Sequence, residues 1–181
     1  MNKLQLIVPN RYFDNRGFFA ETYTRKKFID IGIHDEFVQD NHSVSNKIGT
    51  LRGLHFQAPP SAQAKLVRCG KGAIFDVVVD IRIGSPDYGN WYSYELTEKN
   101  GHQLYVPIGF AHGFVTLEDN CEIVYKCSNY YNKKKELSIL WNDPDINIKW
   151  PLKTQPILSK NDISAPLFRE FNSPFIYKEN S

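Results

Sequence analysis

The chain has 181 residues, 41% of them hydrophobic, and its 22 basic and 20 acidic side chains leave a net charge of +2. This length suits one domain with a real hydrophobic core, and the near-neutral charge excludes a general attraction to nucleic acid. No signal-peptide pattern begins the chain and no apolar run approaches the roughly 18 residues of a membrane span, so we expect a cytoplasmic protein.

Short strands separated by turns dominate the pattern. A strand over residues 4–8 precedes a turn at residues 14–17 and a second strand over residues 18–23. Thr24 is a candidate N-cap for a short helix that ends near Gly32. Further strands are expected around His55 and over residues 65–69, 73–83, 90–97, 102–107, 111–117, 121–128 and 137–141. About ten strands with one early helix predict an all-β antiparallel barrel, because closure removes exposed sheet edges.

The chain changes character after Asp143, where five prolines are spaced through the remaining residues. Residues 144–181 are therefore expected to be a tail that packs over the barrel in short pieces, with one helical turn after Ser159. Neither a repeat nor a low-complexity segment divides the sequence. We expect residues 1–181 to form a single domain.

Hydrogen-bonding and titratable side chains are concentrated in residues 39–65. Two histidines, an arginine, two lysines and several amides occur there, a density that a core strand would not tolerate unpaired. His55 and Gln57 alternate with Leu54 and Phe56, so they share one strand face. That face is expected to line a polar cavity, the alternative being a hydrogen-bonded core histidine.

A third histidine, His112, follows Pro107 and Gly109 in another turn-rich segment, which we expect to form the second wall of the same pocket. Lys65 and Tyr125 each lie on an otherwise apolar strand face, where an ammonium or hydroxyl needs a partner or a ligand. A lysine that extends to solvent, or a core tyrosine, is the plainer interpretation of each residue alone. A functional site is favoured only if Lys65 and Tyr125 lie together with the histidines in one pocket.

Arg16, Arg52 and Lys65 stand among glycines and prolines in settings suited to binding a diphosphate, with a solvated surface position as the alternative for Arg16. Four aromatic residues have flat faces that could stack on a base or sugar, namely Phe18, Phe19, Tyr130 and Tyr131. The alternative for each is a place in the hydrophobic core.

Metal binding is suggested by the spacing of Gly101, Pro107, Gly109 and His112, which resembles the second motif of cupins. The first cupin motif supplies two histidines and a glutamate, whereas this chain has only His55 there. A single histidine cannot complete a three- or four-ligand sphere, so no metal is expected. The three cysteines lack a CxxC spacing and are expected to be reduced and mostly buried.

As a whole the chain resembles the dTDP-4-dehydrorhamnose 3,5-epimerase family of sugar-nucleotide cupins. The resemblance is carried by ordered motifs at residues 16–21 (RGFFAE), 39–42 (QDNH), 51–57 (LRGLHFQ), 65–69 (KLVRC), 76–82 (DVVVDIR), 109–114 (GFAHGF), 141–144 (WNDP) and 158–162 (LSKND). It implies a jelly-roll barrel, a homodimer, and neither a metal nor an organic cofactor.

The resemblance also implies residue roles. His55 would be the base that removes a proton beside a ketone, with Asp162 orienting its ring. Tyr125 would be the acid on the opposite face, and Lys65 would stabilise the enolate oxygen. Sugar and nucleotide diphosphate would be held by Arg16, Glu21, Gln39, Asn41, Arg52, His112, Tyr130 and Glu136.

These implications favour inversion of C3 and C5 of dTDP-4-dehydro-6-deoxyglucose, giving dTDP-4-dehydro-L-rhamnose. Asn161 and the basic run at residues 132–136 depart from the family's usual pattern, which leaves a GDP-linked 4-keto heptose of capsule or surface polysaccharide synthesis as an alternative substrate, inverted at C3 or at both centres. A noncatalytic nucleotide-sugar-binding cupin would not need a base, its orienting carboxylate and an acid. A metal-dependent cupin oxygenase or isomerase would need ligands that the chain lacks.

Overall fold

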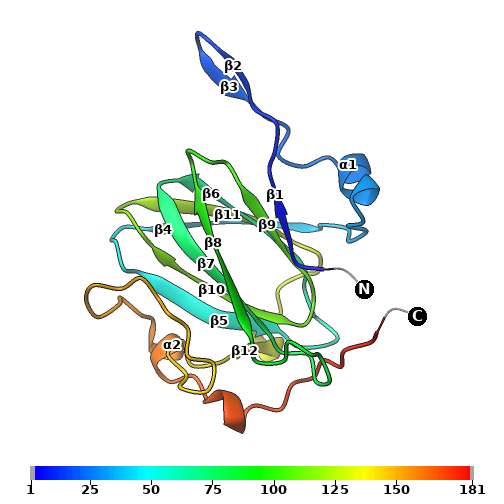
Figure 1. Ribbon diagram of the computed structural model, residues 1–181, viewed down its shortest axis with the longest axis vertical. Helices are drawn as coiled ribbons and strands as arrows, with labels where there is room; N and C mark the ends of the chain where they lie inside the picture. The colour runs from blue at the N-terminus through cyan, green and yellow to red at the C-terminus, as the bar shows by residue number, and fades with distance from the viewer. Residues whose placement is uncertain (1–2, 180–181) are drawn as a thin grey trace.

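Two five-stranded antiparallel sheets form the body of the computed structural model, which describes residues 3–179 (Figure 1). The first sheet has the order β1 (Gln5–Ile7), β9 (Gln103–Val106), β6 (Lys65–Lys71), β11 (Cys121–Cys127) and β4 (Gln39–Ser45). The second has the order β12 (Glu136–Ser138), β5 (Leu51–Gln57), β10 (Phe110–Thr116), β7 (Ala73–Asp80) and β8 (Trp91–Thr97). The predicted all-β jelly-roll barrel is confirmed.

The space between the sheets is filled by apolar side chains from both. Val67 and Ile123 come from the first sheet, and Val78 and Leu96 from the second, and none of these four is measurably exposed. Their β-branched and aliphatic side chains alternate inward along each strand, as the period of two requires. Full burial of such a side chain is worth about 1.5–3 kcal/mol, so this layer holds the two walls of the interior together.

Each sheet is also covered on its outer face. The tail covers the second sheet, where Leu54 and Val79 pack with Ile146 and Phe175. Helix α1 (Arg25–Asp30) covers the first sheet through Phe28. The predicted early helix is thus confirmed, and Thr24 is at its N-cap, although the Thr24 side chain makes no capping hydrogen bond.

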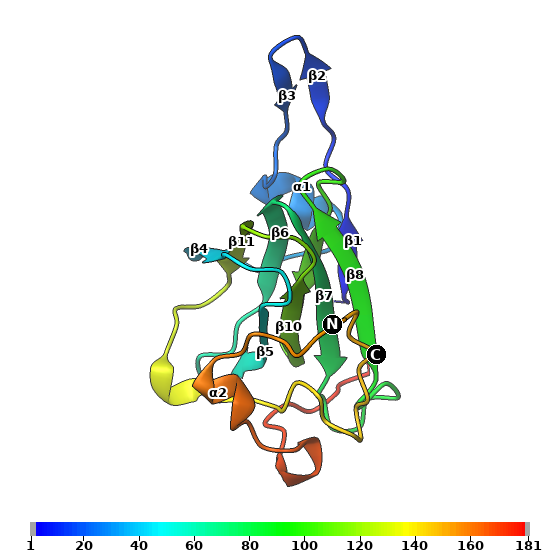
Figure 2. The same ribbon diagram turned by 90° about the vertical axis from the view of Figure 1, so that its left-hand side faces the viewer.

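A hairpin of β2 (Tyr12–Asp14) and β3 (Gly17–Phe19) projects away from both sheets, as Figures 1 and 2 show. The expected strand over residues 18–23 is wrong beyond Phe19, because the chain then turns toward α1. The buried Gln103 side chain donates to the carbonyl of Thr22 and fixes that path. The hairpin leaves large aromatic surface exposed, with Phe13 73% exposed.

The tail contains the short helices α2 (Lys160–Ile163) and η2 (Phe168–Glu170), while η1 (Lys133–Lys135) precedes β12. The helical turn expected after Ser159 is confirmed by α2. Parallel bridges join Ile157 to Thr50 and Ile176 to Ile83, so the tail is fixed to the body at two places. Within residues 3–179, every helix is too short or too polar to span a membrane.

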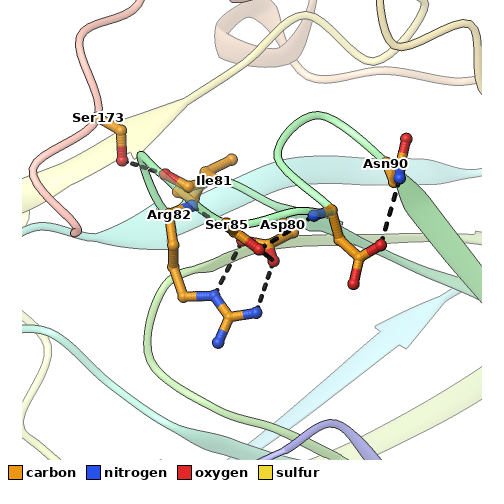
Figure 3. Close-up of polar contacts among 7 residues, drawn as sticks. Asp80, Ile81, Arg82, Ser85, Asn90 and Ser173 are labelled. Atoms are coloured by element: carbon orange, nitrogen blue, oxygen red, sulfur yellow. Dashed lines mark hydrogen bonds and ion pairs between the residues drawn. The ribbon is translucent and has the colours of Figure 1, made fainter. Parts of the chain in front are cut away.

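A buried ion pair lies at the end of β7, next to the tail (Figure 3). Arg82 donates from Nε and Nη2 to the two carboxylate oxygens of Asp80, at 2.9 and 2.5 Å, and Ser85 Oγ donates to the same carboxylate at 2.7 Å. Asp80 is fully buried, and the Arg82 guanidinium lies 4.6 Å from the ring centroid of Phe110. The hydroxyl of Ser173 donates to the carbonyl of Ile81, which ties the tail to this cluster.

Replacing Asp80 with alanine is expected to lower the free energy of unfolding by about 3–5 kcal/mol, because the substitution removes the buried carboxylate that pairs with the Arg82 guanidinium and accepts from Ser85 Oγ. Urea denaturation measures the loss. The exposed Asp30 supplies the control, since Asp30→Ala should change stability by less than about 0.5 kcal/mol. Equal stabilities for the two variants would contradict this account of the ion pair.

Candidate active site

Two adjoining cavities of about 250 and 200 Å³ share His55, Lys65 and Tyr125. The larger is also lined by Gln39, Asn41, Phe56, Gln57, Gln63, Cys127, Tyr131 and Glu136. The smaller is also lined by Ser43, Arg52, Val67, His112, Phe114, Ile123, Ser159 and Asp162. His55 and His112 are opposite each other in the β5–β10 ladder, so the two segments expected to form one pocket do meet.

A bulge in β5 aims two functional side chains the same way. Between the pairs His112–His55 and Phe114–Arg52, β10 advances two residues while β5 advances three. A regular strand would turn Arg52 and His55 to opposite faces, but the extra residue lets both line the smaller cavity. Gly53 makes this possible: its φ is +133°, and a Cβ there would lie 2.5 Å from the Cα of Gly113.

His55 is held by a carboxylate from the tail. Its Nε2 lies 2.5 Å from Oδ1 of Asp162, 107 residues further along the chain. Donation of the Nε2 proton to that carboxylate leaves the lone pair on Nδ1, in the state that a general base requires. Burial alone would raise the pKa of Asp162, but hydrogen bonds from His55 and Ser159 outweigh it and hold the pKa below its ordinary value. The carboxylate therefore stays ionised beside the imidazole.

A second histidine–carboxylate pair lies next to Lys65. Nε2 of His112 is 2.8 Å from Oδ2 of Asp76, and both residues are buried. Burial lowers the pKa of Lys65, an effect that the nearby Cys127, Asp76 and Glu136 partly oppose. An ammonium with a lowered pKa is a strong hydrogen-bond donor, which suits it to meet negative charge that develops on a ligand oxygen.

Tyr125 faces the cavities from β11, in the sheet opposite His55. Burial and the nearby Cys127 raise its pKa, although the charge of Arg52 acts against this. The phenol is therefore protonated at neutral pH and has a proton to donate. Ile123 and Cys127 share its strand face, as the alternation in the sequence predicts.

Five of the eight expected substrate-binding residues line these cavities, namely Gln39, Asn41, Arg52, His112 and Glu136. Tyr130 does not line them and is 67% exposed. Its neighbour Tyr131 does, because its backbone N–H donates to Gln39 and its hydroxyl to Glu136.

Arg16 and Glu21 lie away from both cavities of their own chain. Arg16, at the tip of the projecting hairpin, pairs with Asp14 at 2.6 Å, and Glu21 pairs with Lys27. The exposed hairpin, which carries Arg16, and the segment that follows it, which carries Glu21, thus do not bring these two expected binding residues to the site of the same chain.

Sequence reasoning gave no role to several residues that the structure places here. Asp76 is fully buried beside His112. The sequence does contain a sign of this residue, because Asp76 is an acidic residue within the apolar run of β7. Gln63 and Ser159 had no comparable signal, since isolated polar residues near turns are common. The described chain, residues 3–179, contains no group of three histidine, cysteine or acidic side chains arranged to hold a metal ion.

A jelly-roll barrel in which a histidine–carboxylate pair faces a tyrosine and a lysine has the base, the acid and the oxyanion donor of an isomerase that removes and returns a proton, and this is the class that the fold and the site indicate. The comparisons narrow this class. A family model described as dTDP-4-dehydrorhamnose 3,5-epimerase matches residues 1–170, and the chain belongs to that family.

Individual relatives agree. A dTDP-4-dehydrorhamnose 3,5-epimerase of Sinorhizobium fredii is 48% identical over 97% of this chain and 90% of its own length. One of Shigella flexneri is 52% identical over 90% of each chain. The solved dTDP-6-deoxy-D-glucose-3,5-epimerase of Legionella pneumophila, in complex with dTDP-4-keto-L-rhamnose, has a TM-score of 0.93 and 44% identity, covering 97% of this chain and 94% of that one.

Proposed function

We propose that this chain is an isomerase that inverts C3 and C5 of dTDP-4-dehydro-6-deoxyglucose to give dTDP-4-dehydro-L-rhamnose. One observation carries the proposal: His55 on β5 and Tyr125 on β11 reach the same cavity from opposite sheets. Inversion requires that a proton leave one face of a carbon and return to the other. A sugar ring lying between the two sheets would meet a base on one face and an acid on the other.

The chemistry needs only groups that are present in the cavity. The 4-keto group acidifies the hydrogens on C3 and C5, so Nδ1 of His55 can remove a proton. Lys65 would hold the negative charge that develops on the C4 oxygen, within a cavity that restricts competing water. Tyr125 would then protonate the carbon from the opposite face. We propose Asp162 as the residue that keeps the imidazole in the reactive tautomer.

Substrate recognition would use the polar wall around this centre. We propose that Gln39, Asn41 and Glu136 bind in the larger cavity, while Arg52 and His112 bind beside the reacting ring. The GDP-linked heptose considered from the sequence finds no support in the relatives reported above, which are all named for dTDP-linked sugars.

We further propose that the chain works as a homodimer of single-domain subunits, each with its tail packed on the barrel. The projecting hairpin supports this, because Phe13, Phe18 and Phe19 are each more than half exposed on it. Arg16 is on the same hairpin, so docking on a second copy could bring it to that copy's site. A sedimentation mass of one chain would contradict the dimer, and a mass of two chains would support it.

A cytoplasmic location is proposed on separate grounds. Cys69, Cys121 and Cys127 are buried and unpaired, as expected for a reducing compartment.

The experiment that tests the proposed function identifies the product. The purified protein is incubated with dTDP-4-dehydro-6-deoxyglucose, the 4-keto group is reduced with borohydride, and the released 6-deoxy sugars are identified. L-rhamnose and its C4 epimer are expected. Sugars inverted at C3 alone would make the chain a C3 epimerase, and only the unepimerised D-sugars would contradict an epimerase on this substrate.

Tyr125→Phe is expected to separate proton removal from inversion. Without the hydroxyl the base can still exchange a substrate proton with solvent, but delivery from the opposite face is lost, so exchange should outpace product formation by about 10²-fold or more. Deuterium incorporation into recovered substrate measures this ratio. Tyr92→Phe on β8 is the matched control, because Tyr92 is exposed and lines neither cavity, and wild-type behaviour is expected of it. Equal losses of exchange and inversion in Tyr125→Phe would contradict its role as the acid.

A further inference from the structure

The carboxylate that holds His55 is itself held, at its other oxygen. Oδ1 of Asp162 faces the imidazole, while Oδ2 accepts a hydrogen bond from Oγ of Ser159 at 2.6 Å. The backbone N–H of Ser159 approaches the same oxygen at 3.4 Å. Asp162 is 2% exposed, so little water is available to replace a lost partner.

Ser159 can make these contacts because it is the N-cap of α2. Its Oγ accepts from the backbone N–H of Asp162 at 3.1 Å, and Asp162 is the third helical residue, so the two side chains form a reciprocal capping box. The helix is only four residues long, so the capping box supplies much of its local order. The same carboxylate thus completes a helix cap and contacts the catalytic histidine.

The backbone fixes this arrangement relative to β5. Two residues before Ser159, Ile157 donates to Gly49 and accepts from the N–H of Leu51, the first residue of β5. Ser159 therefore has a defined position relative to the strand that carries His55. Both Ser159 and Asp162 line the smaller cavity.

We propose that Ser159 is a positioning residue for the epimerase reaction: its hydroxyl fixes the rotation of the Asp162 carboxylate so that Oδ1 meets Nε2 of His55. This inference rests on the proposed function, but its geometric part does not require turnover. If Ser159 lost its hydroxyl, the carboxylate could rotate about its last side-chain bond, and His55 would spend less time in the reactive tautomer and orientation.

The test compares four variants of the full-length protein by two readouts, and a fifth variant, His55→Ala, serves only to assign the second readout. Ser159→Ala and Ser159→Gly both remove the donor, and glycine is itself an acceptable N-cap, so the second variant guards against simple loss of the helix. Ser159→Thr keeps a hydroxyl. Ser164→Ala is the matched control. Ser164 is the C-cap of the same helix, and its Oγ donates to the carbonyl of Lys160 rather than to Asp162.

We expect Ser159→Ala and Ser159→Gly to lower kcat by about 10- to 100-fold with KM within about twofold, since ring placement changes and substrate contacts do not. Ser159→Thr and Ser164→Ala should stay within about twofold of the wild type. The second readout is the downfield proton resonance of the His55–Asp162 hydrogen bond, assigned by its absence in His55→Ala. This resonance should weaken or move upfield in Ser159→Ala and Ser159→Gly, and it should be unchanged in Ser159→Thr and Ser164→Ala.

Wild-type kcat in both donor-deleted variants would overturn the proposal. An unchanged downfield proton despite a lower kcat would also overturn it, because Ser159 would then act by some route other than Asp162. The resonance is measured without substrate. A wild-type protein that shows the resonance but does not turn over the dTDP sugar would refute the proposed function while the effect of Ser159 on the hydrogen bond is still tested.

Discussion

Replacing His55 with alanine is expected to lower kcat by about 10²- to 10⁴-fold and to stop deuterium exchange at both C3 and C5. The same imidazole serves both carbons in this account. Among residues 3–179, His112 is the only other histidine that lines the cavities, and its side chain is 9% exposed against 33% for His55. Turnover is measured by product analysis and exchange by proton NMR in D2O.

The control for His55 is another histidine on the same barrel. His42 is on β4, where it faces outward, is exposed and pairs with Glu122 at 3.2 Å. His42→Ala should retain turnover within about twofold, with a similar melting temperature in both variants. Near-normal turnover in His55→Ala would contradict the base assignment, and exchange lost at only one carbon would mean that a second group serves the other.

Lys65→Met is expected to lower kcat by about 10²- to 10³-fold with a much smaller change in KM. Methionine nearly matches the length of the lysine stem but carries no charge, so the substitution removes the ammonium that we propose faces the C4 oxygen. That oxygen is neutral in the bound ketone and negative in the enolate, and the loss should therefore fall on the transition state. Steady-state kinetics with the dTDP-linked 4-keto sugar measure the two constants.

The matched control for Lys65 comes from β11. Lys126 pairs with the exposed Asp40 at 2.8 Å, and it lines neither cavity. Lys126→Met should leave kcat within about twofold. If Lys65→Met raised KM but left kcat unchanged, Lys65 would bind the ketone substrate and the transition state equally, and it would not stabilise the enolate selectively.

Much of the fold follows from local sequence signals. β6, β7, β10 and β11 are runs of β-branched and apolar residues bounded by turns, and their bounds differ from the expected ones by a few residues at most. The period of two correctly placed Leu54 and Phe56 in the core and His55 at the cavity. These features were predictable because each depends on residues that are close together along the chain.

Features set by contacts between distant segments were not predictable in the same way. The bulge at Gly53 depends on Gly113 in the neighbouring strand, so the sequence of β5 alone does not reveal that Arg52 and His55 face the same cavity. Likewise, the hydrogen bond between His55 and Asp162 became an expectation only through resemblance to a family. The turn at residues 14–17 was predicted correctly, but the projection of the hairpin away from both sheets was not, because its exposed aromatics have the composition of a core strand.

The most direct test of the central claim is proton NMR of the wild-type protein with dTDP-4-dehydro-6-deoxyglucose in D2O. This account predicts that the C3 and C5 proton signals both disappear as deuterium replaces them, while the anomeric C1 proton persists. Loss of the C3 signal alone would restrict the reaction to one centre. Persistence of both signals would contradict an epimerase acting on this sugar.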